Sequence, residues 1–169
     1  MLDGENAQQM MDRINASTTY QEGCLTNGKP ITEENIKELL AKFEEAMPTG
    51  SPWYGGDKAY LYYSPKLGNG MGCNSFAYAV SDAIFGKNAP MNKHQDFGQI
   101  KVGDIVWIKN GDSSQSHVAV ITSLTNKWTN QYSTCDAGGT QGVSWVGHEE
   151  YAAFEDPSFA PYTWIYSRY

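Results

Sequence analysis

One cysteine of this sequence stands where a thiol can be activated. Cys73 follows the glycine-rich stretch Gly68–Gly72 and opens a segment whose apolar residues have helical spacing. In the first turn of a helix the main-chain N–H groups lack partners and the helix dipole favours negative charge, so a thiolate is stabilised there. This position predicts a nucleophile at Cys73, with a buried and inert thiol as the alternative. Cys24, in an irregular loop, and Cys135, in a predicted strand, are interpreted as inert.

A cysteine nucleophile needs a base, and the three histidines differ in their settings. His117 follows a polar loop and begins the apolar run His117–Ile121, which is predicted to be a strand. An imidazole at the end of a strand is held by a rigid sheet, where a base can be positioned accurately. His94 lies in a polar loop and His148 in an exposed segment. His117 is therefore the candidate base, and a surface histidine at a strand start is the alternative.

The third member of such a site orients the imidazole and stabilises its cation by accepting a hydrogen bond. Asp136 ends the strand that is predicted to follow the His117 strand, so the two residues are neighbours in an antiparallel arrangement. The alternative is that Asp136 caps the turn Asp136–Gly139. The sequence thus offers Cys73, His117 and Asp136 as one candidate catalytic set.

Other chemistries fit the sequence poorly. The glycines before Cys73 lack the Gly-Lys-Ser/Thr of a phosphate loop, and no Gly-x-Ser-x-Gly elbow is present. No pair of ligands has local metal spacing, so we expect no metal and no cofactor. Twelve Lys and Arg residues against nineteen Asp and Glu residues give a net charge of −7. Because basic residues do not cluster, nucleic acid is not expected as a partner.

Three helices are expected to position these residues. The first, at residues 7–14 with Asp3 as its cap, has apolar residues spaced at i, i+3, i+4 and i+7. The second begins after Thr32, an N-cap candidate, and has the clearest apolar stripe of the chain. The third begins at Cys73 and is closed by Gly86, at the place of a left-handed cap.

The rest of the chain is predicted to be loop and strand. Residues 49–72 are interpreted as a loop, with Tyr60–Tyr63 as its only candidate strand or helical turn. Beyond Val102, apolar runs of strand length lie at 105–108, 117–121, 128–134, 143–146 and 162–166. Helices followed by consecutive strands predict an α+β domain, with an antiparallel sheet of about five strands covered by helices on one side.

The sequence shows no segment for export or membrane insertion. Met1–Tyr20 is polar and lacks an apolar stretch of signal-peptide length, and the longest apolar runs are too short to cross a bilayer. Three cysteines cannot form a disulfide scaffold in a chain of 169 residues. These features leave open whether the chain is cytoplasmic or a trimmed piece of an exported protein.

Three segments together resemble the papain-like cysteine peptidases of the NlpC-like and CHAP (cysteine, histidine-dependent amidohydrolase/peptidase) kind. They are Gly-Met-Gly-Cys73-Asn-Ser-Phe-Ala, Val-Gly-Asp104-Ile-Val-Trp-Ile and Ser-His117-Val-Ala-Val-Ile, with Asp136 at the place of the family's polar third residue. The family often has Asn after that residue, where this chain has Ala-Gly-Gly. The resemblance spans residues 30–169, so it implies a papain-like domain at 30–169 and an N-terminal helical extension at 1–29.

The resemblance implies hydrolysis of an amide, most often in the stem peptides of peptidoglycan or between sugar and peptide. The Cys73 thiolate would attack the carbonyl to form a thioester acyl-enzyme, and His117 would protonate the leaving amine and then activate water. The Cys73 amide and one of Tyr60, Tyr62 or Tyr63 would hold the oxyanion, with a packed tyrosine as the alternative.

The resemblance also implies an extracellular or cell-wall location, a peptidoglycan or peptide substrate, and a monomer. The segment from Pro30 to Trp53 is similar to the lead-in found before such domains in exported proteins of Gram-positive bacteria. Two alternatives stay open because a fold does not fix a substrate. One is a non-catalytic module that binds cell wall or protein, and the other is a thiol acyltransferase or toxin effector.

Overall fold

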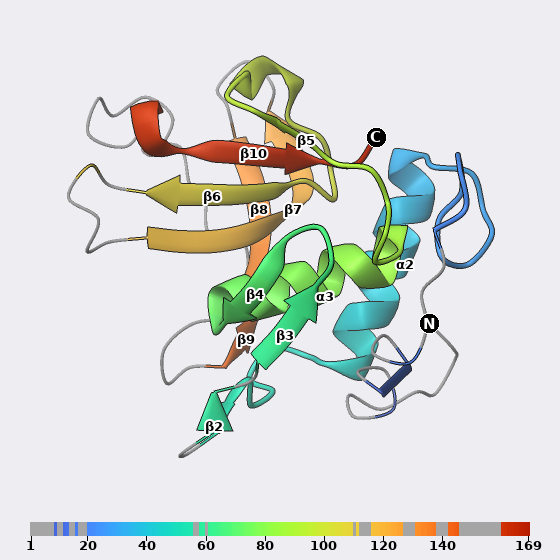
Figure 1. The fold of residues 1–169 in the computed structure, drawn as a ribbon, viewed down its shortest axis with the longest axis vertical. Helices are drawn as coiled ribbons and strands as arrows, with labels where there is room; N and C mark the ends of the chain where they lie inside the picture. Colours follow the sequence, from blue (N-terminus) through green and yellow to red (C-terminus); the bar gives the residue numbers. More distant parts are fainter. Residues whose placement is uncertain are drawn as a thin grey trace.

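The α+β architecture expected from the sequence is present in the computed structural model of the chain (Figure 1). The structure describes residues 20–55, 58–59, 61–109, 111, 116–126, 131–137, 142–145 and 160–169, together with Gln9, Asp12, Arg13 and Ala16. These last four residues are helical. The rest of the helix expected at 7–14, including its cap candidate Asp3, lies outside the described residues.

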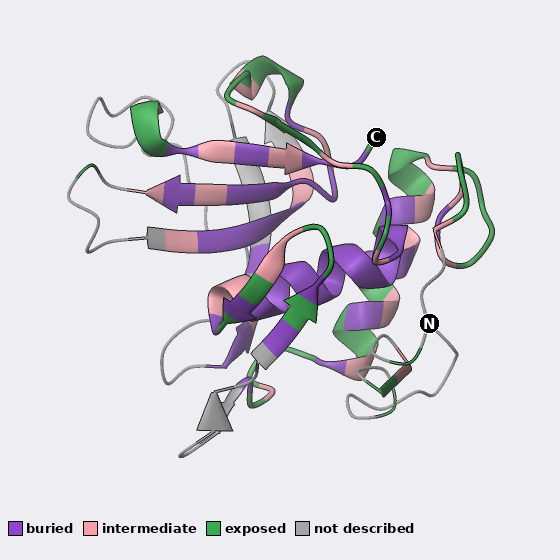
Figure 2. Cartoon of the chain, in the orientation of Figure 1, coloured by how far each residue is buried: buried purple, intermediate pink, exposed green. Residues whose placement is uncertain are grey.

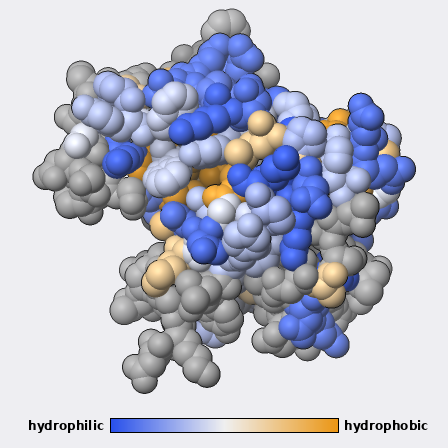
Figure 3. All heavy atoms as spheres, in the orientation of Figure 1, coloured by the Kyte–Doolittle hydropathy of each residue, from blue (hydrophilic) through white to orange (hydrophobic). Residues whose placement is uncertain are grey.

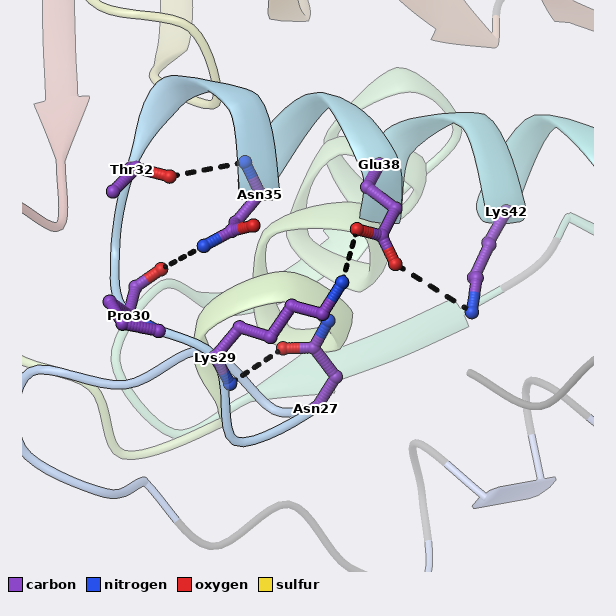
Figure 4. Close-up of polar contacts among 7 residues, drawn as sticks. All are labelled: Asn27, Lys29, Pro30, Thr32, Asn35, Glu38 and Lys42. Carbon is purple, nitrogen blue, oxygen red and sulfur yellow. Dashed lines mark hydrogen bonds and ion pairs between the residues drawn. The ribbon is translucent and has the colours of Figure 1, made fainter.

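Helix α2 (Glu33–Ala46) begins at the expected N-cap. Thr32 is extended, and its hydroxyl accepts a hydrogen bond from the Asn35 N–H at 3.2 Å. The Asn35 side chain donates to the Pro30 carbonyl at 2.9 Å, and Lys29 pairs with Glu38, so the preceding segment is fastened to the exposed side of the helix (Figure 4). The buried side chains are those of the predicted stripe: Ile36, Leu39, Leu40 and Phe43.

The interpretation of residues 49–72 as a loop is wrong in part, because the segment contains four short strands. β1 (Tyr54–Gly55) pairs with β2 (Lys58–Ala59), and β3 (Leu61–Ser64) pairs with β4 (Gly68–Met71), both antiparallel.

Strand β4 has the sequence Gly-Asn-Gly-Met, which has little intrinsic strand preference. Tertiary packing holds it in place. A Cβ at Gly70 would lie 2.7 Å from the main-chain nitrogen of Ser75, in the first turn of the next helix. Glycine therefore lets the β3–β4 hairpin lie directly on the start of that helix.

Helix α3 (Cys73–Phe85) begins and ends where the sequence predicts. Every residue from Ser75 to Phe85 is buried, which makes α3 the central helix of the core (Figure 2). It packs against α2, the β3–β4 hairpin and the large sheet. Gly86 has the expected positive φ of 92°, but its ψ of 145° lies outside the left-handed helical region.

The large sheet is antiparallel and has six strands in the order β5-β10-β6-β7-β8-β9. Five of them match the expected runs with shifted ends: β6 (Ile105–Lys109), β7 (Ser116–Asn126), β8 (Gln131–Ala137), β9 (Val143–Ser144) and β10 (Trp164–Ser167).

The sixth strand is β5 (Asn92–His94), so the prediction of a polar loop around His94 is wrong. It is an edge strand with half-buried and exposed residues, so it carries no apolar pattern. The C-terminal strand β10 inserts between β5 and β6, which brings the end of the chain back into the sheet.

Apolar side chains cover both faces of the sheet. On the α3 side, Ile105, Val118 and Val120 join the main core cluster. The opposite side carries a separate cluster made of Ile100, Val106, Ile108, Ala119, Ile121 and Ile165. Within the described part of the chain, no helix combines the length and apolar character needed to cross a membrane.

The segment before α2 also packs against the main core cluster. Leu25 is buried with 2% of its surface exposed, and the Thr26 N–H donates to the Ile84 carbonyl at 3.0 Å. Residues within the expected extension 1–29 therefore pack on the C-terminal end of α3.

Candidate active site

The thiol of Cys73 lies at the uncapped N-terminus of α3. Cys73 is half-buried and is the first residue of the helix. Gly72 occupies the N-cap position with φ 58°, and no side chain caps the helix, so nothing competes with the thiol for the first amides. The indole of Trp53 donates to the Gly72 carbonyl at 3.0 Å and fixes the turn that precedes the cysteine.

The imidazole of His117 hydrogen-bonds the Cys73 thiol, so the two side chains are neighbours. Their roles as nucleophile and base stay predictions. The main-chain amides of Val118 and Asn74 also hydrogen-bond the sulfur. Burial has the largest single influence on the pKa of Cys73 and raises it. The hydrogen bonds and the charge of His117 together outweigh burial, so the pKa of Cys73 lies below its ordinary value and the thiolate is favoured.

The hydrogen-bond pattern of β7 explains how the end of a strand meets the end of a helix. Ile121 donates to the Asp104 carbonyl at 2.9 Å and accepts from the Gly103 N–H at 2.8 Å, so it is directed toward the β6 side. Because directions alternate along a strand, Val118 points its N–H toward the β8 side. On that side, the pairing of β7 with β8 begins only at Val120, so Val118 has no partner residue in β8. The first turn of α3 lies beside this start of β7 (Figure 1).

Asp136 lies in β8, the strand next to β7, as expected from the sequence. The main chains of Asp136 and Ala137 pair with Ser144 and Val143 of β9, so both are strand residues. The other two residues of the turn considered as an alternative, Gly138 and Gly139, lie outside the described residues. The side chain of Asp136 lies outside the described residues, and its role in orienting His117 stays a prediction. His148 also lies outside them.

Tyr62 of β3 does not reach the thiol. The Tyr62 hydroxyl donates to Asp82 Oδ2 at 3.0 Å, in the last turn of α3, at the opposite end of the helix from Cys73. Tyr62 is therefore a packed tyrosine and not the second oxyanion donor. Tyr63 is 63% exposed, and Tyr60 lies outside the described residues. The main-chain amide of Cys73 and the hydroxyls of Tyr60 and Tyr63 stay predictions as groups that hold the oxyanion.

Asn74 is a neighbour of the thiol that the sequence analysis missed. The Cys73 thiol donates to Asn74 Oδ1 at 3.6 Å, so the side chain can hold the proton of the neutral form. Its position directly after the cysteine was the available signal.

The C-terminal end of α3 carries a buried ion pair that no local sequence pattern predicts. Arg168 Nη2 lies 2.8 Å from Asp82 Oδ1, and the two side chains are 2% and 0% exposed. This contact is close but not aligned as a hydrogen bond, whereas Arg168 Nη1 donates to the Gly86 carbonyl at 2.6 Å. Burial is the largest influence on the pKa of Asp82 and raises it despite the cation beside it.

Asp104, in the second segment of the resemblance, is a structural carboxyl. It is 1% exposed, and its Oδ2 accepts a hydrogen bond from the Lys101 N–H at 2.9 Å. Burial raises the pKa of Asp104 to about 6. The residue fixes the turn that leads into β6 and does not belong to the set around Cys73.

The other sequence-based expectations concern cysteines and metals. Cys135 is buried in β8, Cys24 is half-buried, and no disulfide joins any of the three cysteines. Within the described ranges, no three His, Cys, Asp or Glu side chains come together as a metal site. Comparisons with protein-family models, with curated proteins and with solved structures found no match to this chain.

Proposed function

We propose that this protein is a cysteine-dependent amide hydrolase that acts through a thioester acyl-enzyme. The observation that carries the proposal is the hydrogen bond between the Cys73 thiol and the His117 imidazole at the free N-terminus of α3. A half-buried thiol whose thiolate is favoured, next to a base on a rigid strand, is the arrangement that nucleophilic cysteine catalysis needs.

In the proposed mechanism each step belongs to one group. The Cys73 thiolate attacks the carbonyl carbon, and the oxyanion forms next to the N-terminal amides of α3. Protonated His117 gives its proton to the leaving amine, and the C–N bond breaks to leave a thioester. His117 then takes a proton from water, whose oxygen attacks the thioester and releases the acid and the free thiol. Asp136, one strand away, is proposed to orient His117.

The resemblance to NlpC-like and CHAP peptidases supports the choice of substrate. Its three segments form the start of α3, the entry to β6 and the start of β7, in the same order along the chain. We therefore propose a papain-like arrangement, a peptide substrate of the peptidoglycan stem type, and an extracellular or cell-wall location.

Alkylation by iodoacetamide at neutral pH tests the activated thiol directly. Cys24 serves as an internal control, because it is half-buried like Cys73 but lies in no helix N-terminus. We expect Cys73 to react at least about ten times faster than Cys24 or Cys135, measured by peptide mass spectrometry over time. Equal and slow reaction of all three thiols would remove the basis of the proposal.

Digestion of purified muropeptides tests the reaction and the bond. The wild-type chain should produce new amine and carboxyl termini that mass spectrometry identifies, and Cys73→Ala should produce none while its thermal midpoint stays close to that of the wild type. Binding without any product would favour the non-catalytic module. Transfer of the acyl group to an added amine in preference to water would favour an acyltransferase.

A further inference from the structure

A groove lined by aromatic rings and lysines lies on the α3 side of the sheet. It has a volume of about 210 Å³ and is formed by β5, β6, β10 and the turn before β10. We call it the aromatic–lysine groove, and its lining includes Lys93, Trp107, Lys109, Tyr162, Trp164 and Tyr166.

The rings of the groove are held in place by the sheet. Trp107 and Trp164 are directly opposite each other in the β6–β10 register, so their side chains share one face. The Tyr166 ring lies 6.2 Å from the Trp107 ring. At the outer end, a Cβ on Gly111 would lie 2.7 Å from the Tyr162 ring, which shows how closely that ring packs on the segment after β6.

The lysines of the groove differ from those on α2 and in the segment before it. Lys29, Lys37 and Lys42 each pair with a glutamate on that helix. Lys93 instead lies over the Trp164 ring at 4.3 Å, and no carboxylate of the described residues pairs with it or with Lys109. In a chain with a net charge of −7, the groove therefore gathers two lysines that no carboxylate of the described residues neutralises.

The groove begins one strand away from the candidate active site. Trp107 lies opposite Val118, whose N–H binds the Cys73 thiol, and Trp164 lies one strand further out. Adjacent strands are about 5 Å apart, so two or three residues of an extended peptide span the distance from the thiol to the groove. Figure 3 shows a hollow with an apolar floor between this part of the sheet and the β3–β4 hairpin.

We infer that the aromatic–lysine groove binds an acidic side chain of a peptide substrate while Cys73 acts on an amide nearby. The inference rests on the proposed function. Complete ligand pockets measure about 300–1,000 Å³, so a groove of this size is a subsite of a longer substrate. The rings contact the aliphatic part of the side chain, and the ammonium groups of Lys93 and Lys109 pair with its carboxylate.

Binding to the full chain carrying Cys73→Ala tests the inference without turnover. The probes are acetyl-Ala-Glu-Ala-Glu-amide and its Gln counterpart, followed by the indole N–H signals of Trp107 and Trp164 in NMR titrations. We expect the Glu peptide to bind about ten times more tightly at low salt, and to lose most of this preference at high salt. Lys93→Gln and Lys109→Gln should each remove most of the preference.

Lys42→Gln on α2 makes the same change in net charge away from the groove and should leave the preference intact. Equal affinity for the two peptides, no binding of either, or binding only of a neutral oligosaccharide of N-acetylglucosamine would overturn the inference. The alkylation rate of Cys73 in the wild-type chain separates the two proposals. A fast-reacting Cys73 without Glu preference overturns the groove alone, and Glu preference with an unreactive Cys73 overturns the hydrolase.

Discussion

At its N-terminal end α3 presents Cys73, which is half-buried and hydrogen-bonded to His117. At its C-terminal end it presents Asp82, which is fully buried and paired with Arg168. Burial is the largest influence on both pKa values and raises both, yet the pKa of Cys73 ends below its ordinary value and that of Asp82 ends above it.

The difference follows first from His117, whose hydrogen bond to the sulfur is the largest influence that lowers the pKa of Cys73. The two ends of a helix also differ in what they offer to an anion. The first turn has free N–H groups and the positive end of the dipole, and it is partly open to water. The last turn has the negative end of the dipole, and the Asp82 carboxylate there has lost all contact with water. One helix thus holds a reactive group at one end and a structural group at the other. Asp82 accepts a hydrogen bond from Tyr62 of β3 and forms an ion pair with Arg168 near the C-terminus of the chain.

Removing the imidazole has the largest expected effect and acts on the N-terminal end. His117→Gln should lower amide turnover by about 10²- to 10⁴-fold, because the general base is lost. Since His117 favours the thiolate, the substitution should also raise the pKa of Cys73, so the pH midpoint of its alkylation moves upward. The rate of iodoacetamide reaction against pH measures this. His94→Gln on β5 is the control, and an unchanged midpoint in His117→Gln would contradict the pairing.

Removing the cation acts on the C-terminal end. Arg168→Met leaves the Asp82 carboxylate buried without its partner and should lower the free energy of unfolding by about 3–5 kcal/mol, measured in urea. Combining it with Asp82→Leu should recover most of the loss, because no buried charge remains. In the folded variants the pH midpoint of Cys73 alkylation should stay at the wild-type value. A shifted midpoint would mean that the two ends of α3 are coupled.

The smallest expected effect concerns the hydroxyl that connects the hairpin to α3. Tyr62→Phe removes one hydrogen bond to Asp82 and should cost about 1–2 kcal/mol of stability, with turnover unchanged. Tyr63→Phe, on the exposed side of the hairpin, is the matched control and should change neither quantity. A large loss of turnover in Tyr62→Phe at full folding would return Tyr62 to the oxyanion site.

Sequence reasoning succeeded where a signal is local. The cap at Thr32, the stripe of α2 and the bounds of α3 follow from side chains within a few residues of each other. It failed for β4, whose glycines read as loop, and for β5, whose polar residues form an edge strand. In both cases pairing with a partner strand overrides weak local preference.

The candidate site divides in the same way. The sequence by itself placed a cysteine at a helix start and a histidine at a strand start, because helix caps and apolar runs are encoded locally. Only the tertiary structure decided that β7 is unpaired with β8 before Val120, which lets the start of β7 meet the start of α3. It also decided that the Tyr62 hydroxyl contacts Asp82 and that the rings of β10 lie beside Trp107. Such contacts join residues far apart in the chain, and their energy comes from burial and strand pairing that exist only once the sheet has formed.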